Sequence, residues 1–168
     1  MICIETERLL IRELKETDFK DIMEIWGNYE VMKYCGVFEN YGSDHFINVI
    51  RRYNKLQENR GFSVYCVLNK KTGNLLGVCG FNPVELSDEL ELIYHFKKNQ
   101  WGRGYATESC NAILDYIKAH FSNTKVIASV NKENTASRRV LEKLGFKYIG
   151  DKWYDDSNEY EPFFELVI

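Results

Sequence analysis

The hydrophobic pattern changes period along the chain, and this change limits the folds that the sequence can adopt. Residues 62–69 and 74–84 are short runs rich in Val, Leu, Phe and Cys, and the KKTG segment between them is typical of a turn. The next run, ELELIYHFK at residues 89–97, alternates charged and apolar side chains. We therefore expect a hairpin followed by a further strand.

Helical patterns precede and follow these strands. Helices are expected at residues 17–28, 43–56, 106–121 and 134–144, where apolar side chains recur at helical spacing or a terminal glycine follows. Further strands are expected at residues 8–13, 125–130, 146–153 and 160–167. The resulting order, βαα, βββ, αβα, ββ, predicts a mixed α+β (or α/β) sheet layered with helices.

The composition fits one globular domain and argues against several classes of function. The chain has 168 residues, 45% of them hydrophobic, so we expect a single domain over residues 1–168. A formal charge of −3 argues against a nucleic-acid partner. No run approaches the roughly 18 apolar residues of a membrane span. The five cysteines lack metal-ligand spacing, and Cys66, Cys79 and Cys110 lie in apolar runs. We expect a cytoplasmic, metal-free monomer or homodimer with these three cysteines in its core.

The segment WGRGYA, residues 101–106, is the strongest local sign of a binding site. It lies between a predicted strand and the first turn of a predicted helix. Gly102 and Gly104 allow a sharp turn and a close approach of a ligand to the backbone. The N–H groups at a helix start point toward an anion, and Arg103 could add a charged contact. A simple tight turn is the alternative, because a bare GxG is weak evidence.

The segment is neither GxxxxGK[ST] nor GxGxxG, so a nucleotide-binding loop of either kind is poorly supported. The string LIYHFKKNQWGRGYATE instead resembles the acyl-CoA-binding motif of the GNAT acetyltransferases, in particular their RimJ/RimL-like branch. The strings ETERLLIREL, LLGVCGF and NKENTASRRVLEKLGFKYIG also fall in the order and spacing of that family. The resemblance therefore extends over nearly the whole chain.

The resemblance implies a GNAT-like fold and a co-substrate, acetyl-CoA. The fold would be a central, mostly antiparallel sheet of six to seven strands flanked by about four helices. The activity implied is N-acetyl transfer to an amine acceptor. The consensus Q/R-x-x-G-x-G/A has Trp at its first place here. The residues implied to bind CoA are Phe96 on the strand edge, Trp101, Gly102, Arg103, Gly104, Tyr105 and Ala106 in the loop, and Asn134 and Ser137 beyond it.

Asn134 and Ser137 open the helix that follows KVIASV, and their spacing of three places them on one helix face. Asn134 is a good N-cap by itself, so capping alone explains this pair on spacing. The resemblance implies a second role, in which an Asn here contacts the pantetheine arm and the nearby hydroxyl lies close to the thioester sulfur. We favour this second role.

Transfer to an amine needs a group that accepts a proton, because an alkylamine is mostly protonated at neutral pH. Glu91, on the strand leading to WGRGYA, is the favoured base, acting directly or through water; the resemblance also points to it. His95 is the alternative. Residues two apart on a strand share a face, so Glu91, His95 and Glu89 face the same way. A solvated strand face is the competing interpretation.

A proton donor for the leaving thiolate is less clear. Many members of the family carry a Tyr in the last helix, but Leu141 stands at the matching place. Ser137 then becomes the hydroxyl expected near the sulfur. The reaction can also proceed without a formal acid, because holding the two reactants together lowers a barrier by roughly 7 to 11 kcal/mol.

Two groups of residues are candidates for binding the amine acceptor. Acidic residues gather at 85–91 and 151–161, where they could attract a cationic amine, although exposed turns are commonly charged. Aromatic residues at 26, 29, 34, 38 and 41 could border the acceptor or belong to the core. A peptide N-terminus and a small amine both remain open as acceptors. A non-catalytic acyl-CoA-binding or sensing module is the alternative function, since such a loop can outlast catalytic groups.

Overall fold

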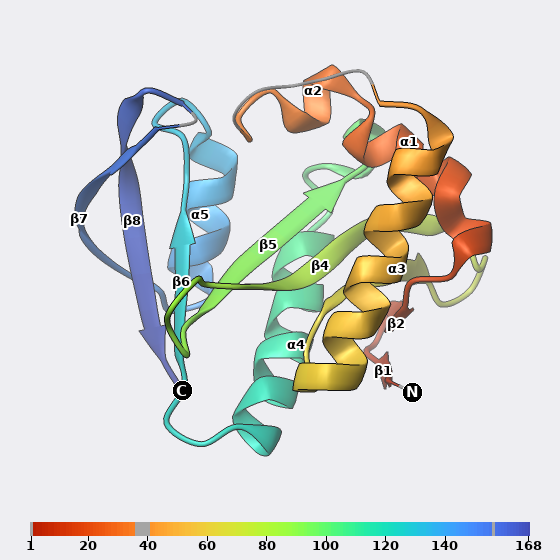
Figure 1. Cartoon of the computed structure of the whole chain (residues 1–168), viewed down its shortest axis with the longest axis horizontal. Coiled ribbons are helices and arrows are strands. Elements are labelled where there is room, and N and C mark those ends of the chain that lie inside the picture. The colour runs from red at the N-terminus through yellow and green to blue at the C-terminus, as the bar shows by residue number, and fades with distance from the viewer. Residues whose placement is uncertain (1, 36–40, 156) are drawn as a thin grey trace.

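A single eight-stranded sheet organises the described part of the chain in this computed structural model, which covers residues 2–35, 41–155 and 157–168. The strand order is β1-β2-β3-β4-β5-β6-β8-β7, and every neighbouring pair is antiparallel except β5 and β6, which are parallel (Figure 1). The strands β1 to β8 are Cys3–Glu5, Leu9–Glu13, Val64–Asn69, Leu75–Pro83, Leu90–Phe96, Lys125–Ser129, Lys147–Tyr154 and Glu159–Val167.

Helices cover both faces of this sheet. The α-helices α1 to α5 are Phe19–Trp26, Tyr29–Met32, Ser43–Arg60, Tyr105–His120 and Thr135–Lys143, and two short 3₁₀ helices are η1 at Glu16–Asp18 and η2 at Lys98–Gln100. Helices α1 and α3 pack on one face, with α2 above the end of β5, and α4 and α5 pack on the other (Figure 1). We call these the α1–α3 face and the α4–α5 face.

The period-two pattern of the central strands explains why the sheet has two cores. Tyr65 of β3 lies in the core beneath α4, whereas its neighbour Cys66 lies in the core beneath α1 and α3. Successive side chains on a strand point to opposite faces, so a strand with apolar residues at every position is buried on both. Cys79 and Cys110 are buried with Tyr65, so all three cysteines expected in the core lie there.

The expected fold class is confirmed, with small differences in the elements. The described residues form eight strands and five α-helices, where six to seven strands and about four helices were expected. The additional elements are β1, which has three residues, and α2, which has four. Elements this short contain too few residues for a hydrophobic period to be recognised in the sequence. The hairpin of β3 and β4 has the expected turn, with Gly73 at φ 74°.

Candidate functional site

The parallel pair of β5 and β6 separates after two residue pairs. Leu90 pairs with Val126 and Glu91 with Ile127, and beyond these residues the strands diverge (Figure 1). We call the diverging edges, residues 92–96 of β5 and 128–129 of β6, the seam. All of the residues expected to carry chemistry lie along the seam or at its ends.

The edge of β5 toward the seam carries backbone groups that β4 does not use. The N–H of Lys97 donates to the carbonyl of Leu76 at 3.0 Å, which fixes the hydrogen-bonded positions of the antiparallel pair. Because these positions alternate, the backbone groups of Leu92, Tyr94 and Phe96 point away from β4 and into the seam. A linear, amide-containing molecule can pair with such an edge as an added strand would.

The loop between η2 and α4 folds into an anion-binding shape. Gly102 and Gly104 have φ of 73° and 78°, and a Cβ added at Gly102 would have no heavy atom within 4 Å. The first helical hydrogen bond of α4 runs from the N–H of Glu108 to the carbonyl of Gly104 at 3.0 Å. The N–H groups of Tyr105 and Ala106 therefore precede that bond and have no acceptor within the helix. Such N–H groups at the start of a helix are suited to bind an anion.

Two residues of the N-terminal segment hold this loop in place. The guanidinium of Arg8 donates to the carbonyl of Arg103 at 2.9 Å and pairs with Glu108 in the first turn of α4. The hydroxyl of Thr6 donates to the same carboxylate at 2.6 Å. Burial raises the pKa of Glu108, but the hydrogen bonds from Thr6 and Arg8 outweigh it and lower the pKa. The sequence gives no sign of this clamp, because its partners lie about a hundred residues apart.

Trp101 joins the loop to the end of β5. Its indole N–H donates to the carbonyl of Phe96 at 2.8 Å, while the side chain stays about half exposed. The Phe96 ring is buried in the core beneath α4. The Trp101 side chain therefore connects the end of β5 with the glycine loop, the two segments expected from the sequence to bind CoA.

Glu91 lies where the seam opens, on the α1–α3 face of the sheet. Its strand neighbour two residues on, Ile93, packs in the core of that face. The carboxylate accepts a hydrogen bond from the Asn82 amide of β4 at 3.4 Å, and the hydroxyl of Tyr53 in α3 donates to the other end of that amide at 2.9 Å. This chain of contacts orients Glu91. Asn82 and Tyr53 are functional candidates that the sequence pattern did not identify.

His95 lies on the same face as Glu91, but both of its ring nitrogens have partners. The indole N–H of Trp26 donates to Nδ1 at 3.1 Å, so the neutral ring carries its proton on Nε2, 3.3 Å from the sulfur of Cys35. Burial lowers the pKa of His95 to about 4. A ring that is neutral and already hydrogen-bonded on both sides is poorly suited to accept a substrate proton, which favours Glu91 over the alternative base.

A second carboxylate lies near this group. Glu161 of β8 is buried, with only 7% of its surface exposed. Cys35 is exposed as a residue, but protein atoms surround its sulfur, and this desolvation, followed by the charges of Glu161 and Glu91, raises its pKa to about 11. The thiol therefore remains protonated at neutral pH, and the surroundings of Cys35 and Glu91 are electronegative.

The residues that open α5 lie on the other face. The side-chain oxygen of Asn134 accepts the N–H of Ser137 at 3.1 Å, so Asn134 is an N-cap. This bond uses only Oδ1 and leaves the two amide N–H donors of the side chain for another partner. The hydroxyl of Ser137 lies 2.7 Å from that of Tyr94 in β5. Glu91 and Ser137 thus approach the seam from opposite faces of the sheet.

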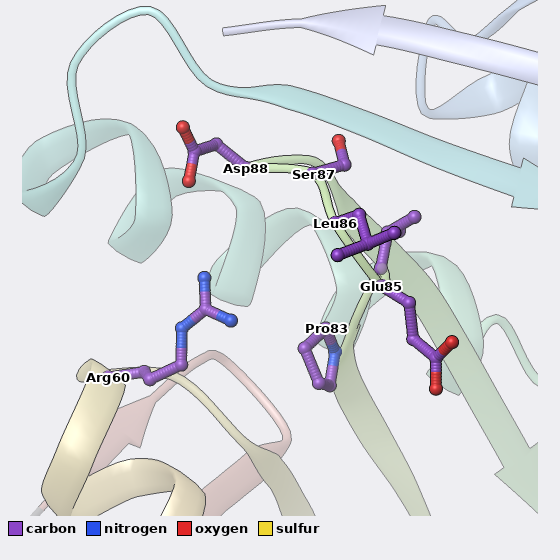
Figure 2. A pocket seen from close by; sticks show the side chains of 7 residues that line it. Arg60, Pro83, Glu85, Leu86, Ser87 and Asp88 are labelled. Atoms are coloured by element: carbon purple, nitrogen blue, oxygen red, sulfur yellow. The ribbon is translucent and has the colours of Figure 1, made fainter.

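The first acidic stretch is divided between two parts of the molecule. Glu85 and Asp88 are in the β4–β5 loop, where they line a recess of about 510 Å³ with Arg60 of α3 (Figure 2). This recess lies before the first residue of β5, whereas the glycine loop follows its last residue, so the length of a seven-residue strand separates them. Glu89 is paired with Lys125 at 3.1 Å. Of the two stretches, Glu91 and Glu161 are the carboxylates placed near Cys35.

Phe38 and Asp156, which the sequence pattern included among the acceptor candidates, lie outside the described residues. Among the described residues, no helix is long and apolar enough to cross a membrane. No group of three or more His, Cys, Asp or Glu side chains in the same residues has an arrangement that could hold a metal ion.

Comparison with known proteins shows which family the chain resembles along its sequence. The family profile described as acetyltransferase (GNAT) domain matches residues 8–147. The chain is 28% identical over 151 residues to an uncharacterised N-acetyltransferase, p20, of Bacillus licheniformis, covering 89% of this chain and 85% of that protein. It is 26% identical over 148 residues to spermidine N(1)-acetyltransferase of Escherichia coli K12, covering 86% and 76%.

A solved structure agrees over almost the full length. The crystal structure of a GNAT-family acetyltransferase from Bacillus anthracis superposes with a TM-score of 0.79 at 28% identity, covering 99% of this chain and 98% of that one. The fold and the sequence therefore lead to the same group of proteins.

Proposed function

The chain belongs to the GNAT acetyltransferase family and is an N-acetyltransferase, and from that premise we propose that it transfers an acetyl group from acetyl-CoA directly to a primary amine. The observation that carries the proposal is the open seam of β5 and β6. It begins at Glu91 on one face, and Ser137 approaches it from the other. Two reactants can therefore meet through the sheet, each entering from its own face.

The CoA side of the proposal rests on backbone groups. The loop at residues 101–106 would bind the diphosphate, and the edge at Leu92, Tyr94 and Phe96 would pair with the pantetheine amides. The Asn134 amide, whose oxygen already caps α5, would donate to the same arm. In these positions the thioester lies near Glu91, where β5 and β6 part.

The acceptor side supplies the base. An amine must lose a proton to attack the thioester carbonyl, and Glu91 would accept it directly or through a water molecule. Asn82 holds the carboxylate and Tyr53 holds Asn82, so the base is fixed before the amine arrives. As the C–N bond forms and the C–S bond breaks, the electron pair of the C–S bond passes to sulfur, where the Ser137 hydroxyl would donate a hydrogen bond.

Direct transfer is favoured over an acetylated enzyme. Cys35 lies close enough to the proposed base for the charge of Glu91 to act on it, and its pKa of about 11 keeps it protonated and weakly nucleophilic. The hydrogen bond of the neutral His95 ring to its sulfur does not activate it, because the Trp26 contact leaves that ring a donor toward Cys35.

The acceptor we propose is a cationic amine: either a small polyamine or a peptide with a free N-terminus. Glu91 and Glu161 make the α1–α3 side of the seam electronegative, and one relative is named for spermidine. Such an enzyme would act in the reducing cytoplasm, where its five free cysteines are stable.

Thiol release tests the proposal. The protein is incubated with acetyl-CoA and a panel of polyamines, N-terminal peptides and matched anionic amines, and free CoA thiol is followed over time. We expect release that depends on the amine, fastest with cationic acceptors and with that preference reduced by salt. CoA binding without thiol release for any amine would instead indicate the non-catalytic binding module, and equal rates for cationic and anionic amines at low salt would overturn the acceptor class.

A further inference from the structure

A tyrosine of β5 contacts the start of α5, the last helix. That helix itself has a leucine, Leu141, where the resemblance implies a tyrosine. Leu141 of α5 is fully buried in the core, so that part of the helix offers no polar group to a ligand. Tyr94 of β5 reaches α5 instead: its hydroxyl lies 2.7 Å from the Oγ of Ser137 and 3.1 Å from the Ser137 carbonyl, so its single proton has two possible acceptors. A phenol is thus present beside Ser137, contributed by a different element.

The contact spans the opening between the strands. Tyr94 lies three residues beyond Glu91, the last residue of β5 that pairs with β6, and α5 follows β6 in the chain. The Tyr94 ring packs against the core of the α4–α5 face. The pair therefore joins the two sides of the seam on the face opposite Glu91, which is where the thioester sulfur lies in the proposed function.

The acidity of the two hydroxyls decides which one donates to the other. With a thiolate bound in the seam as an acceptor for Ser137, the Tyr94 O–H donates to Ser137 Oγ, the nearer of its two possible acceptors, because a phenol is a much stronger acid than an alkyl alcohol. Burial raises the pKa of Tyr94, with a smaller opposing effect of the Ser137 contact, so the phenol keeps its proton. The backbone of Ser137 is fixed in turn by its bond to Asn134. The Ser137 proton is then left to point into the seam.

We propose that Tyr94 is a positioning residue for the leaving thiolate, holding the Ser137 hydroxyl so that its proton faces the sulfur of CoA. This inference rests on the proposed function and adds the group that orients the Ser137 hydroxyl. Tyr94 gives up no proton: it donates a hydrogen bond to Ser137, and Ser137 donates one to the thiolate. The proton that finally neutralises the sulfur comes from solvent.

Tyr94→Phe tests the inference, because it removes the hydroxyl and keeps the ring. We expect turnover to fall about fivefold to tenfold, the usual value of one hydrogen bond, with the KM for acetyl-CoA changed less than twofold. Tyr94→Phe combined with Ser137→Ala should be no slower than Ser137→Ala alone, since both act through one hydroxyl. Tyr116→Phe is the matched control: it removes a phenol of α4 that donates to the backbone carbonyl of Gly61 and does not contact Ser137.

A second readout needs no acceptor. The ionisation of the CoA thiol bound to the protein can be followed by thiolate ultraviolet absorbance against pH, with desulfo-CoA as reference. Burial keeps the thiols of Cys66, Cys79 and Cys110 protonated through the neutral range. We expect the pKa of the bound CoA thiol to lie below that of free CoA, and to rise by up to about one pH unit in Tyr94→Phe and in Ser137→Ala but not in Tyr116→Phe.

The outcomes separate this inference from the function on which it rests. Wild-type turnover together with an unchanged bound-thiol pKa in Tyr94→Phe would overturn it while leaving the transferase intact. A loss confined to melting temperature, equal to that of Tyr116→Phe, would do the same, since it would mark a purely structural contact. A shifted thiol pKa in a wild-type protein that acetylates no amine would support the positioning role and refute the transferase. Failure of CoA to bind would overturn both.

Discussion

The two sides of the seam are built in different ways. On the proposed CoA side, the loop at residues 101–106 is one continuous segment, and the groups proposed to bind the diphosphate are its backbone N–H groups. On the acceptor side, the groups around Glu91 come from separate elements: Asn82 from β4, Tyr53 from α3 and Glu161 from β8. The loop itself is thus a local structure, to which tertiary packing adds only the contacts of Thr6 and Arg8, whereas the surroundings of Glu91 are assembled entirely by tertiary packing. Substitutions on the two sides should therefore have separable effects.

The largest effect is expected at Gly104. Gly104→Val places a branched side chain at φ 78°, a conformation that valine avoids, and projects it where the diphosphate would approach the backbone. Millimolar CoA should raise the melting temperature of the wild type and leave that of the variant unchanged, because only a ligand that binds the folded state stabilises it.

Gly73→Val is the matched control. Gly73 has a φ of 74° in the β3–β4 turn, and a Cβ there would have no heavy atom within 4 Å, whereas a Cβ at Gly104 would contact only the Arg8 guanidinium, at 3.4 Å. The control should lose stability from the same backbone strain and still be stabilised by CoA. A CoA site in this loop would be contradicted if CoA did not raise the melting temperature of the wild type, or if it raised that of Gly104→Val.

The next largest effect belongs to the acceptor side. Glu91→Gln should lower turnover at neutral pH by about 10²-fold or more if Glu91 is the base, with the loss shrinking at high pH as the amine becomes unprotonated by itself. Glu89→Gln changes the same group two residues away, in a carboxylate already paired with Lys125, and should act less than twofold. Turnover of Glu91→Gln at the wild-type level would remove Glu91 from the mechanism, and His95→Ala would then be the next variant to measure.

Asn134 sharpens the comparison, because it combines a structural and a binding role on the CoA side. Asn134→Ala should cost about 1 kcal/mol of stability by loss of the cap, and should raise the KM for acetyl-CoA about threefold to tenfold by loss of the amide donors. Asn134→Ser keeps a capping oxygen, so it should restore the melting temperature but not the KM. Recovery of both by serine would reduce Asn134 to a cap alone.

The smallest effect concerns His95. Burial lowers the pKa of His95 from an ordinary 6.5 to about 4. Between these two pH values the imidazole is therefore protonated in the unfolded chain and neutral in the folded protein. Its contribution to stability is full above pH 6.5 and is lost as the pH falls toward 4, at most about 1.4 kcal/mol per pH unit. The free energy of unfolding of His95→Gln, measured with urea, should depend less steeply on pH in this window than that of the wild type. Equal slopes for wild type and His95→Gln would place an ionised imidazole in the folded protein.

The same contrast explains what the sequence could predict. The period change and the glycine loop are local patterns, so the strands from β3 to β5, helix α4 and the loop were all identified from them. The cap at Asn134 is local as well. The clamp of Arg8 and Glu108, and the contact of Tyr94 with Ser137, join residues far apart in the chain and leave no periodic trace. The sequence could not exclude His95 as the base, because the contacts of Trp26 and Cys35 with its ring form only in the folded structure.

The central claim is that CoA and the acceptor occupy opposite faces of one open seam. A crystal structure of the protein with CoA tests it most directly. We predict diphosphate oxygens within hydrogen-bond distance of the N–H groups of residues 102–106, pantetheine paired with the edge of β5, and the sulfur beside Ser137 with Glu91 across the sheet. A CoA molecule bound away from residues 101–106, or on the same face as Glu91, would contradict the account.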